Sequence, residues 1–306
     1  MLAIPRNVFS LPSVEVWWPD DPGSVIALLG RCPLVTVHGC ADDVAASLEE
    51  YSFRRKSTFT LLFDLSLPKV ELWKGLKRKS CRQDINRALK LRPDIVVNEY
   101  ADDAFRLIND HIRRKGYRRA LRRSEWDGIL SHGDVFSIRC DGVLIAAHAV
   151  LVDWPVRARA TIGGELDPTD SRALGMTGPM NRLLHWHEMN YYKDRGVRRY
   201  DFGGVVVDEA SPMYNITKFK LSFGGETVAE NVLQLWHGDR ARAVIRQLAA
   251  WGVTRQIFHS AVQVGGRFRS AGGIHDRMVA GSTEGGNGLA PGLTHPDPRV
   301  DRGSSP

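Results

Sequence analysis

The sequence predicts a mixed α/β fold, because helical and strand-like segments alternate along the chain. Two apolar segments, 135–140 and 143–152, flank Asp141-Gly142, a dipeptide typical of the turn between antiparallel strands. A third strand is predicted at 156–162. A helix with one apolar face follows over 180–195, and a short strand comes directly after it.

The first 60 residues predict short strands and turns around one helix. A strand at 14–18 is expected to end at Pro19, because proline cannot donate to the hydrogen-bond ladder of a sheet. The helix is predicted over 42–51, with Asp42 or Asp43 near its N-cap. The apolar run 59–65 has the length of a strand.

Two segments concentrate positive charge. In 67–91 the apolar face is formed by Val70, Leu72, Trp73 and Leu76. The opposite face carries seven cations: Lys74, Lys77, Arg78, Lys79, Arg82, Arg87 and Lys90. The second cluster consists of Arg113, Arg114, Lys115, Arg118, Arg119, Arg122 and Arg123. Such density suits contact with nucleic-acid phosphates or with an anionic membrane surface, and also a solvated helix face.

Composition limits the class of protein. The chain has 306 residues, of which 43% are hydrophobic and 25% charged, as in an ordinary globular protein of one or two domains. A net charge of +7 favours an acidic partner such as RNA, a phosphorylated carrier or an anionic membrane, or a basic surface that maintains solubility. The four cysteines form no CxxC pair, which argues against structural zinc and a disulfide framework.

Neither a secretion signal nor an integral membrane segment is expected. The N-terminal residues lack a basic region followed by an apolar core. The longest apolar run, 143–152, is interrupted by His148 and is far shorter than the ~20 residues of a membrane helix. We therefore expect a cytoplasmic protein.

The stretch 191–225 places three elements close together. Gly196 is expected to end the helix after a basic last turn. The strand 199–202 then ends at Gly203-Gly204, which allow a tight turn or the close approach of a ligand. The lysine-bearing segment 216–223 alternates weakly, and we interpret it as an edge strand.

The segment 172–178 lies just before the long helix. A helix N-terminus with nearby glycines binds phosphate well, because free N–H groups and the positive end of the helix dipole face the ligand. The same residues also suit a tight turn that caps the helix, and both interpretations stay open. In the tail we predict amphipathic helices at 236–268, which pack on the domain or contact a membrane surface, and disorder at 269–306.

The helix ending in KDRG, the strand YDFGG and the segment YNITKFKLSFGG form one set of motifs. Two more segments are FDLSLPKVELWKGLKRKSCRQDINRALK and DGVLIAAHAVLV, the second followed by Gly163-Gly164. Together they resemble the Fem-type aminoacyltransferases and proteins with a CelD/BioF2-like acetyltransferase domain, all of the GNAT superfamily. The resemblance covers residues 58–223.

The resemblance implies a GNAT-like fold with two lobes and mixed central sheets. An abbreviated lobe would occupy 1–110, and an acyltransferase lobe 111–235. The implied reaction transfers an acyl or aminoacyl group from acyl-CoA or aminoacyl-tRNA to an amine, forming an amide, with no permanently bound cofactor. A small molecule or a cell-envelope precursor would supply the amine. The alternative is a non-catalytic GNAT-derived module that binds nucleic acid or an anionic membrane surface.

The resemblance also assigns catalytic residues. Lys220 matches the FK of the family's FK-x-x-FGG segment and would lie beside the acyl carbonyl, where a cation stabilises developing negative charge. Otherwise it is a surface lysine. Asp201 would be a base or orienting group, or a carboxylate that fixes the following glycine turn. Tyr214 would donate a proton or line the acceptor pocket, or be an ordinary loop aromatic residue.

Binding residues follow from the same motifs. Lys218, Gly203 and Gly204 would contact substrate. Arg172 and Gly175 match the family's Q/R-x-x-G-x-G/A loop for the pyrophosphate of coenzyme A, whereas Gly178 comes one position late.

Other chemistries lack support in the sequence. No metal site is expected, because His185 and His187 are two positions apart and do not share a helix face. The DFGG sequence is not accompanied by the other kinase motifs, and no G-x-S-x-G is present.

Overall fold

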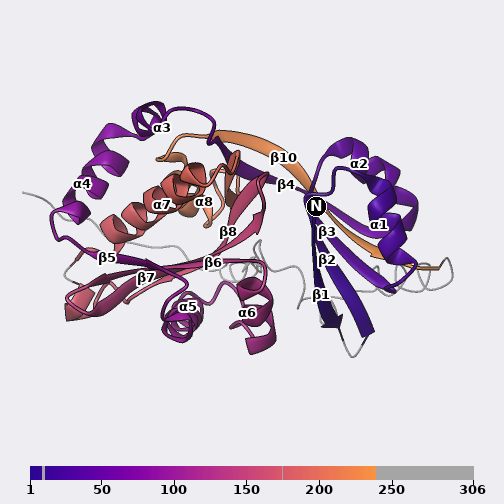
Figure 1. Ribbon diagram of the computed structural model, residues 1–306, viewed down its shortest axis with the longest axis horizontal. Helices are drawn as coiled ribbons and strands as arrows, with labels where there is room; N and C mark the ends of the chain where they lie inside the picture. The colour runs from indigo at the N-terminus through magenta and orange to yellow at the C-terminus, as the bar shows by residue number, and fades with distance from the viewer. Residues whose placement is uncertain (9–10, 174, 239–306) are drawn as a thin grey trace, which may run out of the picture. The chain divides into compact units, whose positions relative to one another are not determined.

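A ten-stranded mixed sheet organises the chain (Figure 1). The computed structural model describes residues 1–8, 11–173 and 175–238. The strands are β1 (Leu2–Val8), β2 (Leu11–Trp17), β3 (Leu34–Cys40), β4 (Ser52–Asp64), β5 (Asp94–Val97), β6 (Gly133–Cys140), β7 (Val143–Asp153), β8 (Arg157–Glu165), β9 (Arg199–Val205) and β10 (Glu226–Trp236). Their order is β1-β2-β3-β10-β4-β9-β8-β7-β6-β5.

Eight α-helices accompany the sheet within these residues. They are α1 (Pro22–Leu29), α2 (Asp42–Ser47), α3 (Lys69–Gly75), α4 (Gln83–Leu89), α5 (Ala101–Lys115), α6 (Arg123–Leu130), α7 (Thr177–Asp194) and α8 (Tyr214–Leu221). Three single turns lie at Glu49–Tyr51, Arg78–Arg82 and Ser171–Ala173.

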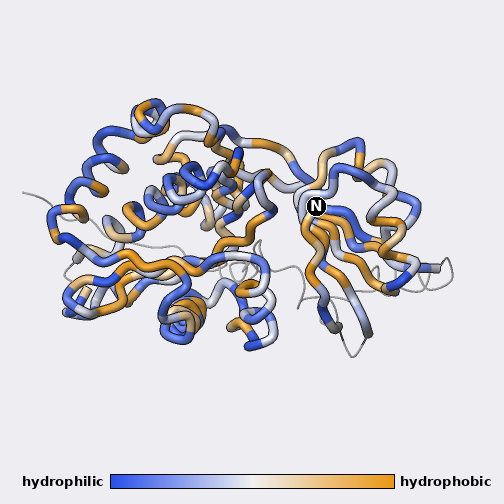
Figure 2. Tube along the Cα trace, viewed as in Figure 1, coloured by the Kyte–Doolittle hydropathy of each residue, from blue (hydrophilic) through white to orange (hydrophobic). Residues whose placement is uncertain are grey.

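Helices cover both faces of the β5–β9 half of the sheet. Side chains alternate along β7, so Ala146 and Val150 join one core with α4 and α7, while Ala147 and Ala149 join a second core with α5 and α6. Figure 1 shows α7 on one side of these strands and α5 and α6 on the other. In Figure 2 the orange, apolar residues run along the strands between them. A third core lies between α1, α2 and strands β2, β3 and β10.

Two long strands hold the sheet together. Strand β4 pairs with β10 from Ser52↔Leu235 to Leu62↔Glu226, and β10 pairs on its other edge with β3. The last described strand therefore lies between two of the first ones. This pairing makes the sheet continuous from β1 to β5.

The parallel strands β8 and β9 pair only briefly. Their partners are Arg157↔Arg199, Ala158↔Tyr200 and Arg159↔Asp201. Beyond these positions β8 continues along β7 as far as Glu165, and β9 continues along β4 as far as Val205. The two strands thus diverge, and we call the place where they part the strand fork.

A bulge on each strand explains the fork. Ala149 and Val150 of β7 face Ile162 and Ala160, so Thr161 of β8 is an extra residue. On β9, Phe202 and Gly203 together stand opposite the single residue between Thr60 and Leu62 of β4. Because a bulge bends its strand and disrupts the ladder, two bulges just after the last shared pair separate the strands.

Most predicted elements are present, with shifted ends. The helix expected at 180–195 is α7, and the Asp-Gly hairpin joins β6 to β7, with φ of 49° at Asp141 and 78° at Gly142. The basic segment 67–91 is divided into α3, the π-helical turn and α4. The mixed α/β fold class is confirmed.

The expected edge strand at 216–223 is wrong, because this segment forms α8. Phe219 of α8 and Phe223, two residues beyond the end of the helix, both lie beside the ring of His185. The predicted helices at 236–268 fall almost entirely outside the described residues, and the predicted disorder at 269–306 falls wholly outside them. No helix among the described residues is long and apolar enough to cross a membrane.

Candidate active site at the strand fork

The Lys220 ammonium lies at the strand fork. Its Nζ donates a hydrogen bond of 2.7 Å to the carbonyl oxygen of Gly204. Gly203 has a φ of +79°, and a Cβ built there would lie 3.0 Å from the oxygen of Ala160 and 3.6 Å from Lys220 Nζ. Atoms of β8, β9 and α8 therefore meet where the strands part, and glycine is needed for both space and conformation.

The surroundings make Lys220 easier to deprotonate than an exposed lysine. Burial lowers its pKa to about 8, and the positive charge of Arg159 acts in the same direction, while Asp201 opposes it. At neutral pH the side chain is still mostly a cation. One of its N–H bonds points to Gly204, so the others can point to a ligand oxygen.

Asp201 lies in a buried network of charges. Its Oδ2 accepts hydrogen bonds from Arg157 Nε at 3.0 Å and Arg159 Nη1 at 2.7 Å, and its Oδ1 accepts from the Gly203 N–H at 2.8 Å and from Thr60. Although burial alone would raise the pKa of Asp201, the two arginines hold it below its ordinary value. So many donors leave Asp201 little basicity, and its bond to Gly203 N–H fixes the glycine turn.

Glu230 of β10 completes this network. It accepts hydrogen bonds from Arg157 at 3.1 Å and from Arg159 at 2.9 Å, so two carboxylates balance two guanidinium groups. The rings of Trp18 and Trp17 cover Arg157 and Arg159, at 5.1 and 5.4 Å from the guanidinium carbons to the ring centroids. The network therefore fixes the bases of β8 and β9 to the first strands of the chain.

In the predicted phosphate loop the glycines lie at the start of α7, but the arginine is engaged by a neighbouring carboxylate. Arg172 is exposed and its guanidinium binds Asp170, with Nη2 2.6 Å from Oδ2. Gly175 adopts a φ of +62°, and Gly178 lies in the first turn of α7. The N-cap residue, Met176, makes no side-chain hydrogen bond to the first turn of α7, in which Thr177 is buried and Pro179 has no backbone N–H.

Tyr214 and Lys218 form a separate pair. The Tyr214 hydroxyl donates to Glu209 at 2.7 Å, and the Lys218 ammonium lies 5.1 Å from the centroid of the Tyr214 ring. Lys218 is exposed, two positions from Lys220, and residues so spaced point to different sides of a helix. The structure thus groups Lys220 with Gly203, Gly204 and Asp201, and Tyr214 with Lys218.

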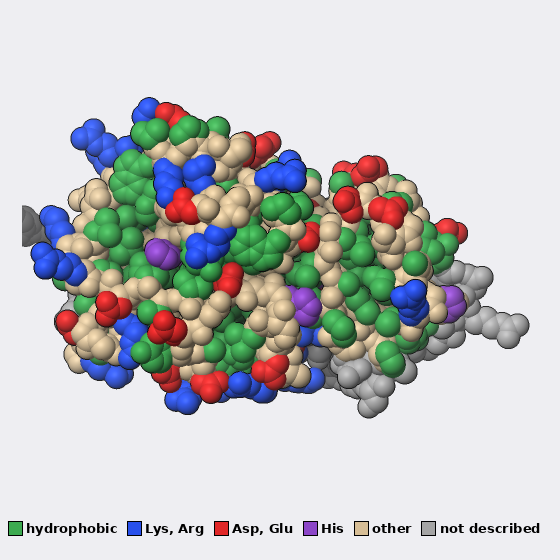
Figure 3. Space-filling view, viewed as in Figure 1, with side chains coloured by type: hydrophobic (Ala, Val, Ile, Leu, Met, Phe, Trp, Pro, Cys, Tyr) green, Lys and Arg blue, Asp and Glu red, His purple; other side chains and the backbone are tan. Residues whose placement is uncertain are grey.

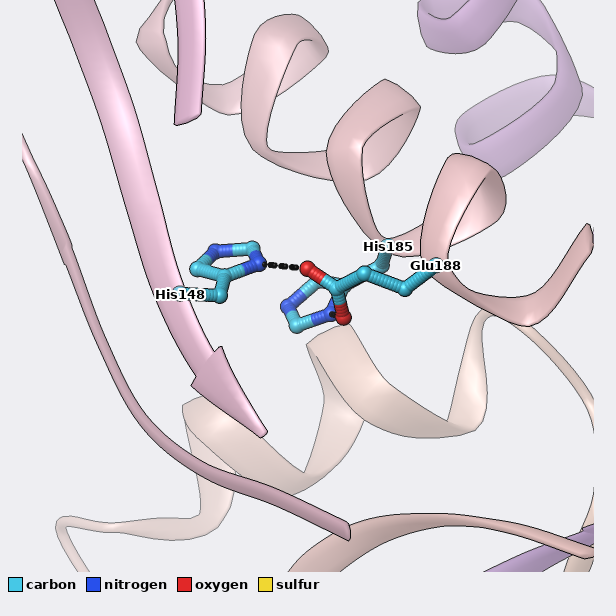
Figure 4. A group of neighbouring side chains, drawn as sticks. All are labelled: His148, His185 and Glu188. Carbon is cyan, nitrogen blue, oxygen red and sulfur yellow. Dashed lines mark hydrogen bonds and ion pairs between the residues drawn. The ribbon is translucent and has the colours of Figure 1, made fainter. Parts of the chain in front are cut away.

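Sequence reasoning missed several buried polar residues. Arg157 and Arg159 are one example, although their spacing of two on a strand places both side chains on one face. His148 is another, and it interrupts an otherwise apolar strand. It lies beside His185 and Glu188, which are three positions apart on α7 (Figure 4). The expectation of no metal considered only the helix segment from His185 to Glu188 and left out His148, which lies on another element.

The two basic clusters differ in their surroundings. In the second one, Arg113, Arg114, Arg119 and Arg123 are engaged with Asp110, Asp167, Glu125 and Asp102. In the first one, five cations are exposed and have no carboxylate partner among the described residues: Lys77, Arg78, Lys79, Arg87 and Lys90. Figure 3 shows Lys and Arg side chains gathered over the α3 and α4 region, at its upper left. In the second cluster Lys115 and Arg122 are also exposed without such a partner among the described residues, so uncompensated charge is more abundant in the first cluster than in the second.

Comparison with solved structures identifies the fold. The crystal structure of FemX matches with a TM-score of 0.58 and 12% sequence identity, over 80% of this chain and 86% of that chain. The structure of L-PGS from Bacillus licheniformis matches with a TM-score of 0.52 and 12% identity, over 80% and 88% of the two chains. No family model matches the sequence. No curated protein matches it either.

FemX and L-PGS thus share the fold of this chain. At such low identity the similarity shows the fold alone. Function therefore has to be argued from the residues at the fork.

Proposed function

We propose that this chain is an acyltransferase that forms an amide between an activated acyl group and an amine. The observation that supports the proposal is the position of Lys220 Nζ at the strand fork, 2.7 Å from Gly204 O. A partly buried cation beside diverging strands suits a reaction in which negative charge develops on a carbonyl oxygen.

The chemistry requires few groups from the protein. The amine attacks the acyl carbon, a C–N bond forms, and the carbonyl oxygen takes up negative charge. Lys220 would stabilise this oxygen through a charge-assisted hydrogen bond. The C–S or C–O bond to the donor then breaks, and the proton lost by the amine passes to the leaving group or to solvent.

The fork would also bind the donor. Backbone N–H and C=O groups of β8 and β9 no longer pair with each other beyond Arg159 and Asp201. An extended acyl chain or linker could take up those hydrogen bonds, as an added strand does at a sheet edge. Gly203 is buried and Gly204 half-buried here, and a side chain at Gly203 would collide with Ala160.

Two donors share the activated carbonyl that this site requires. The N-terminus of α7, which has no side-chain cap from Met176, suits the pyrophosphate of an acyl-CoA, with Gly175 and Gly178 nearby. The exposed cations of the first basic cluster suit the backbone of an aminoacyl-tRNA. The acceptor would be a small amine or a cell-envelope precursor.

Thermal unfolding of the full chain with coenzyme A, acetyl-CoA or total tRNA, at two salt concentrations, tests the proposal. A ligand that binds only the native state raises Tm by mass action. A rise with coenzyme A supports the thioester donor, and a rise with tRNA that weakens with salt supports the aminoacyl ester. No rise with any of the three would contradict the proposal.

The tRNA result alone would also fit the non-catalytic alternative, because the first basic cluster can bind an anion without turnover. Transfer to hydroxylamine, a small amine substitute, separates these outcomes. An acyltransferase forms a hydroxamate from the acylated form of the ligand that raised Tm, either acetyl-CoA or an aminoacyl-tRNA, whereas a binding module does not.

A further inference from the structure

Four polar side chains meet in the protein interior beneath α7, and Figure 4 shows the two histidines and the glutamate among them. They are His148 of β7, His185 and Glu188 of α7, and Tyr200 of β9, with relative exposures of 2%, 8%, 0% and 0%. His148 Nδ1 lies 2.5 Å from Glu188 Oε1, and His185 Nδ1 lies 3.1 Å from Glu188 Oε2. The Tyr200 hydroxyl donates to the same Oε2 and lies 3.2 Å from His185 Nδ1.

The backbone directs these side chains toward one point in the interior. His185 and Glu188 are three residues apart and therefore share a helix face. His148 pairs with Gly163 across the sheet, and a Cβ at Gly163 would lie only 2.6 Å from the His148 ring. Glycine at this position thus makes room for the imidazole.

The surroundings of the cluster are apolar. The His185 ring lies 4.3, 6.0 and 5.8 Å from the rings of Phe202, Phe219 and Phe223, measured between centroids. In such a medium an unbalanced charge is costly, so a buried carboxylate needs a cation or strong donors beside it.

Protonation of the two histidines can balance the negative charge of Glu188 only in part. The His148 and His185 rings are stacked with centroids 4.0 Å apart, so two adjacent imidazolium ions would repel each other. A neutral imidazole offers a nitrogen lone pair, which is what a metal ion binds.

We propose that His148, His185 and Glu188 form a binding site for a divalent transition-metal ion, with Zn²⁺ as the first expectation. Their ligand atoms all lie within 4.8 Å of one another. A tetrahedral zinc site with bonds of about 2.0 Å has edges of about 3.3 Å, close to the two His185 distances of 3.1 and 3.2 Å, whereas the 2.5 Å between His148 Nδ1 and Glu188 Oε1 would have to lengthen around the ion. Two imidazoles and one carboxylate disfavour Ca²⁺ and Mg²⁺, which prefer oxygen ligands alone.

Tyr200 would supply the fourth ligand, because its oxygen already lies beside both His185 Nδ1 and Glu188 Oε2. A site closed by four protein ligands stabilises the fold and leaves no position for substrate. Metal binding would require each imidazole to carry its proton on Nε2, so that Nδ1 offers its lone pair, and would release the Tyr200 hydroxyl proton to solvent, so affinity should fall as the pH is lowered. The site does not depend on the proposed transferase activity.

The test is metal titration of the full chain after treatment with a chelator. We expect one equivalent of Co²⁺ to give the visible absorption of a four-coordinate site without a thiolate charge-transfer band. Zn²⁺ should displace the Co²⁺ and raise Tm. Absence of this one-equivalent spectrum in the wild-type chain would overturn the proposal, whether or not any variant folds.

Variants locate the site. Glu188→Gln keeps the shape and hydrogen-bonding capacity of the side chain but removes the charge, and His185→Gln removes one nitrogen ligand. Each should lower Co²⁺ affinity more than about 100-fold, beyond the 10–100-fold typical of losing an outer-shell partner. His187→Gln, on the same helix but outside the cluster, should leave affinity unchanged. Equal affinity in wild type and Glu188→Gln would mean that the ion binds elsewhere, and would also overturn the proposal.

Discussion

Arg159 and Asp201 are the last paired residues of the two parallel strands, and an ion pair of 2.7 Å joins their side chains. The backbone ladder and the buried charge network therefore end at the same place. Directly beyond it lie Gly203 and the Lys220 ammonium. The charge network holds β8 and β9 together at their last shared pair, and the Lys220 ammonium lies just beyond it, where the strands part.

Replacing Asp201 with Asn should destabilise the protein strongly. The change leaves Arg157 and Arg159 with Glu230 as their one remaining carboxylate, and removing one partner of a buried ion pair costs about 3–5 kcal/mol. Urea unfolding measures the loss. Arg172→Gln, which breaks the exposed pair with Asp170, should cost less than about 1 kcal/mol. Similar losses in the two variants would contradict the role assigned to the network.

Gly203→Ala should reduce both stability and turnover. The φ of +79° costs a non-glycine residue about 1–2 kcal/mol, and the new methyl group would press on the Ala160 oxygen at the fork. Gly204→Ala is the matched control, because its φ is not positive and the nearest atom to its Cβ would be 3.8 Å away. Chemical unfolding should therefore show a larger loss of stability, and the hydroxamate assay a larger loss of turnover, for Gly203→Ala than for Gly204→Ala. The opposite order would be inconsistent with a crowded fork.

The pH dependence of turnover should report the charge of Lys220. If the protonated amine stabilises the oxyanion, kcat/KM with hydroxylamine falls as the pH rises through about 8. A rate that instead rises through this pKa would indicate a general base. Hydroxylamine suits the measurement because it is neutral across that range.

Stability should change in the opposite direction over the same range. The pKa of Lys220 is about 8 in the folded chain, against an ordinary value of 10.5, so between these values the unfolded chain binds more protons. The free energy of unfolding contributed by Lys220 therefore rises from pH 8 to 10.5. In Lys220→Met this part of the pH dependence should disappear.

The first basic cluster should dominate any binding of RNA. Replacing Lys77, Arg78 and Lys79 with Gln should weaken tRNA binding and reduce the slope of log K against log salt by about 1 for each phosphate that is no longer neutralised. Replacing Arg106 and Arg113, which are paired with Asp103 and Asp110, should change the slope little. Fluorescence anisotropy at several salt concentrations measures both sets. Equal effects would show that ion pairing on the surface does not decide where RNA binds.

Local sequence signals predicted part of the fold. The Asp-Gly turn predicted the β6–β7 hairpin, and apolar periodicity together with Gly196 predicted α7. The segment that forms α8 carries too short an apolar pattern to separate helix from strand. Its helical state depends on the packing of Phe219 and Phe223 around His185, which is a tertiary contact.

Only the candidate site residues that belong to a sequence motif could be predicted. Lys220, Gly203 and Gly204 belong to glycine-bounded segments, whereas Arg157 and Arg159 gain their partners from strand register. That register depends on β10 lying next to β4, a pairing between distant parts of the chain. The approach of His148 to Glu188 likewise requires α7 to be packed on β7.

The central claim is that Lys220 acts on the reacting carbonyl. The most direct test compares Lys220→Met with Lys218→Met in hydroxamate formation from the donor that raises Tm. We predict a loss of about 100-fold or more in kcat for Lys220→Met, the size typical of removing one oxyanion donor, and near wild-type turnover for Lys218→Met. Full activity in a folded Lys220→Met variant would contradict the account.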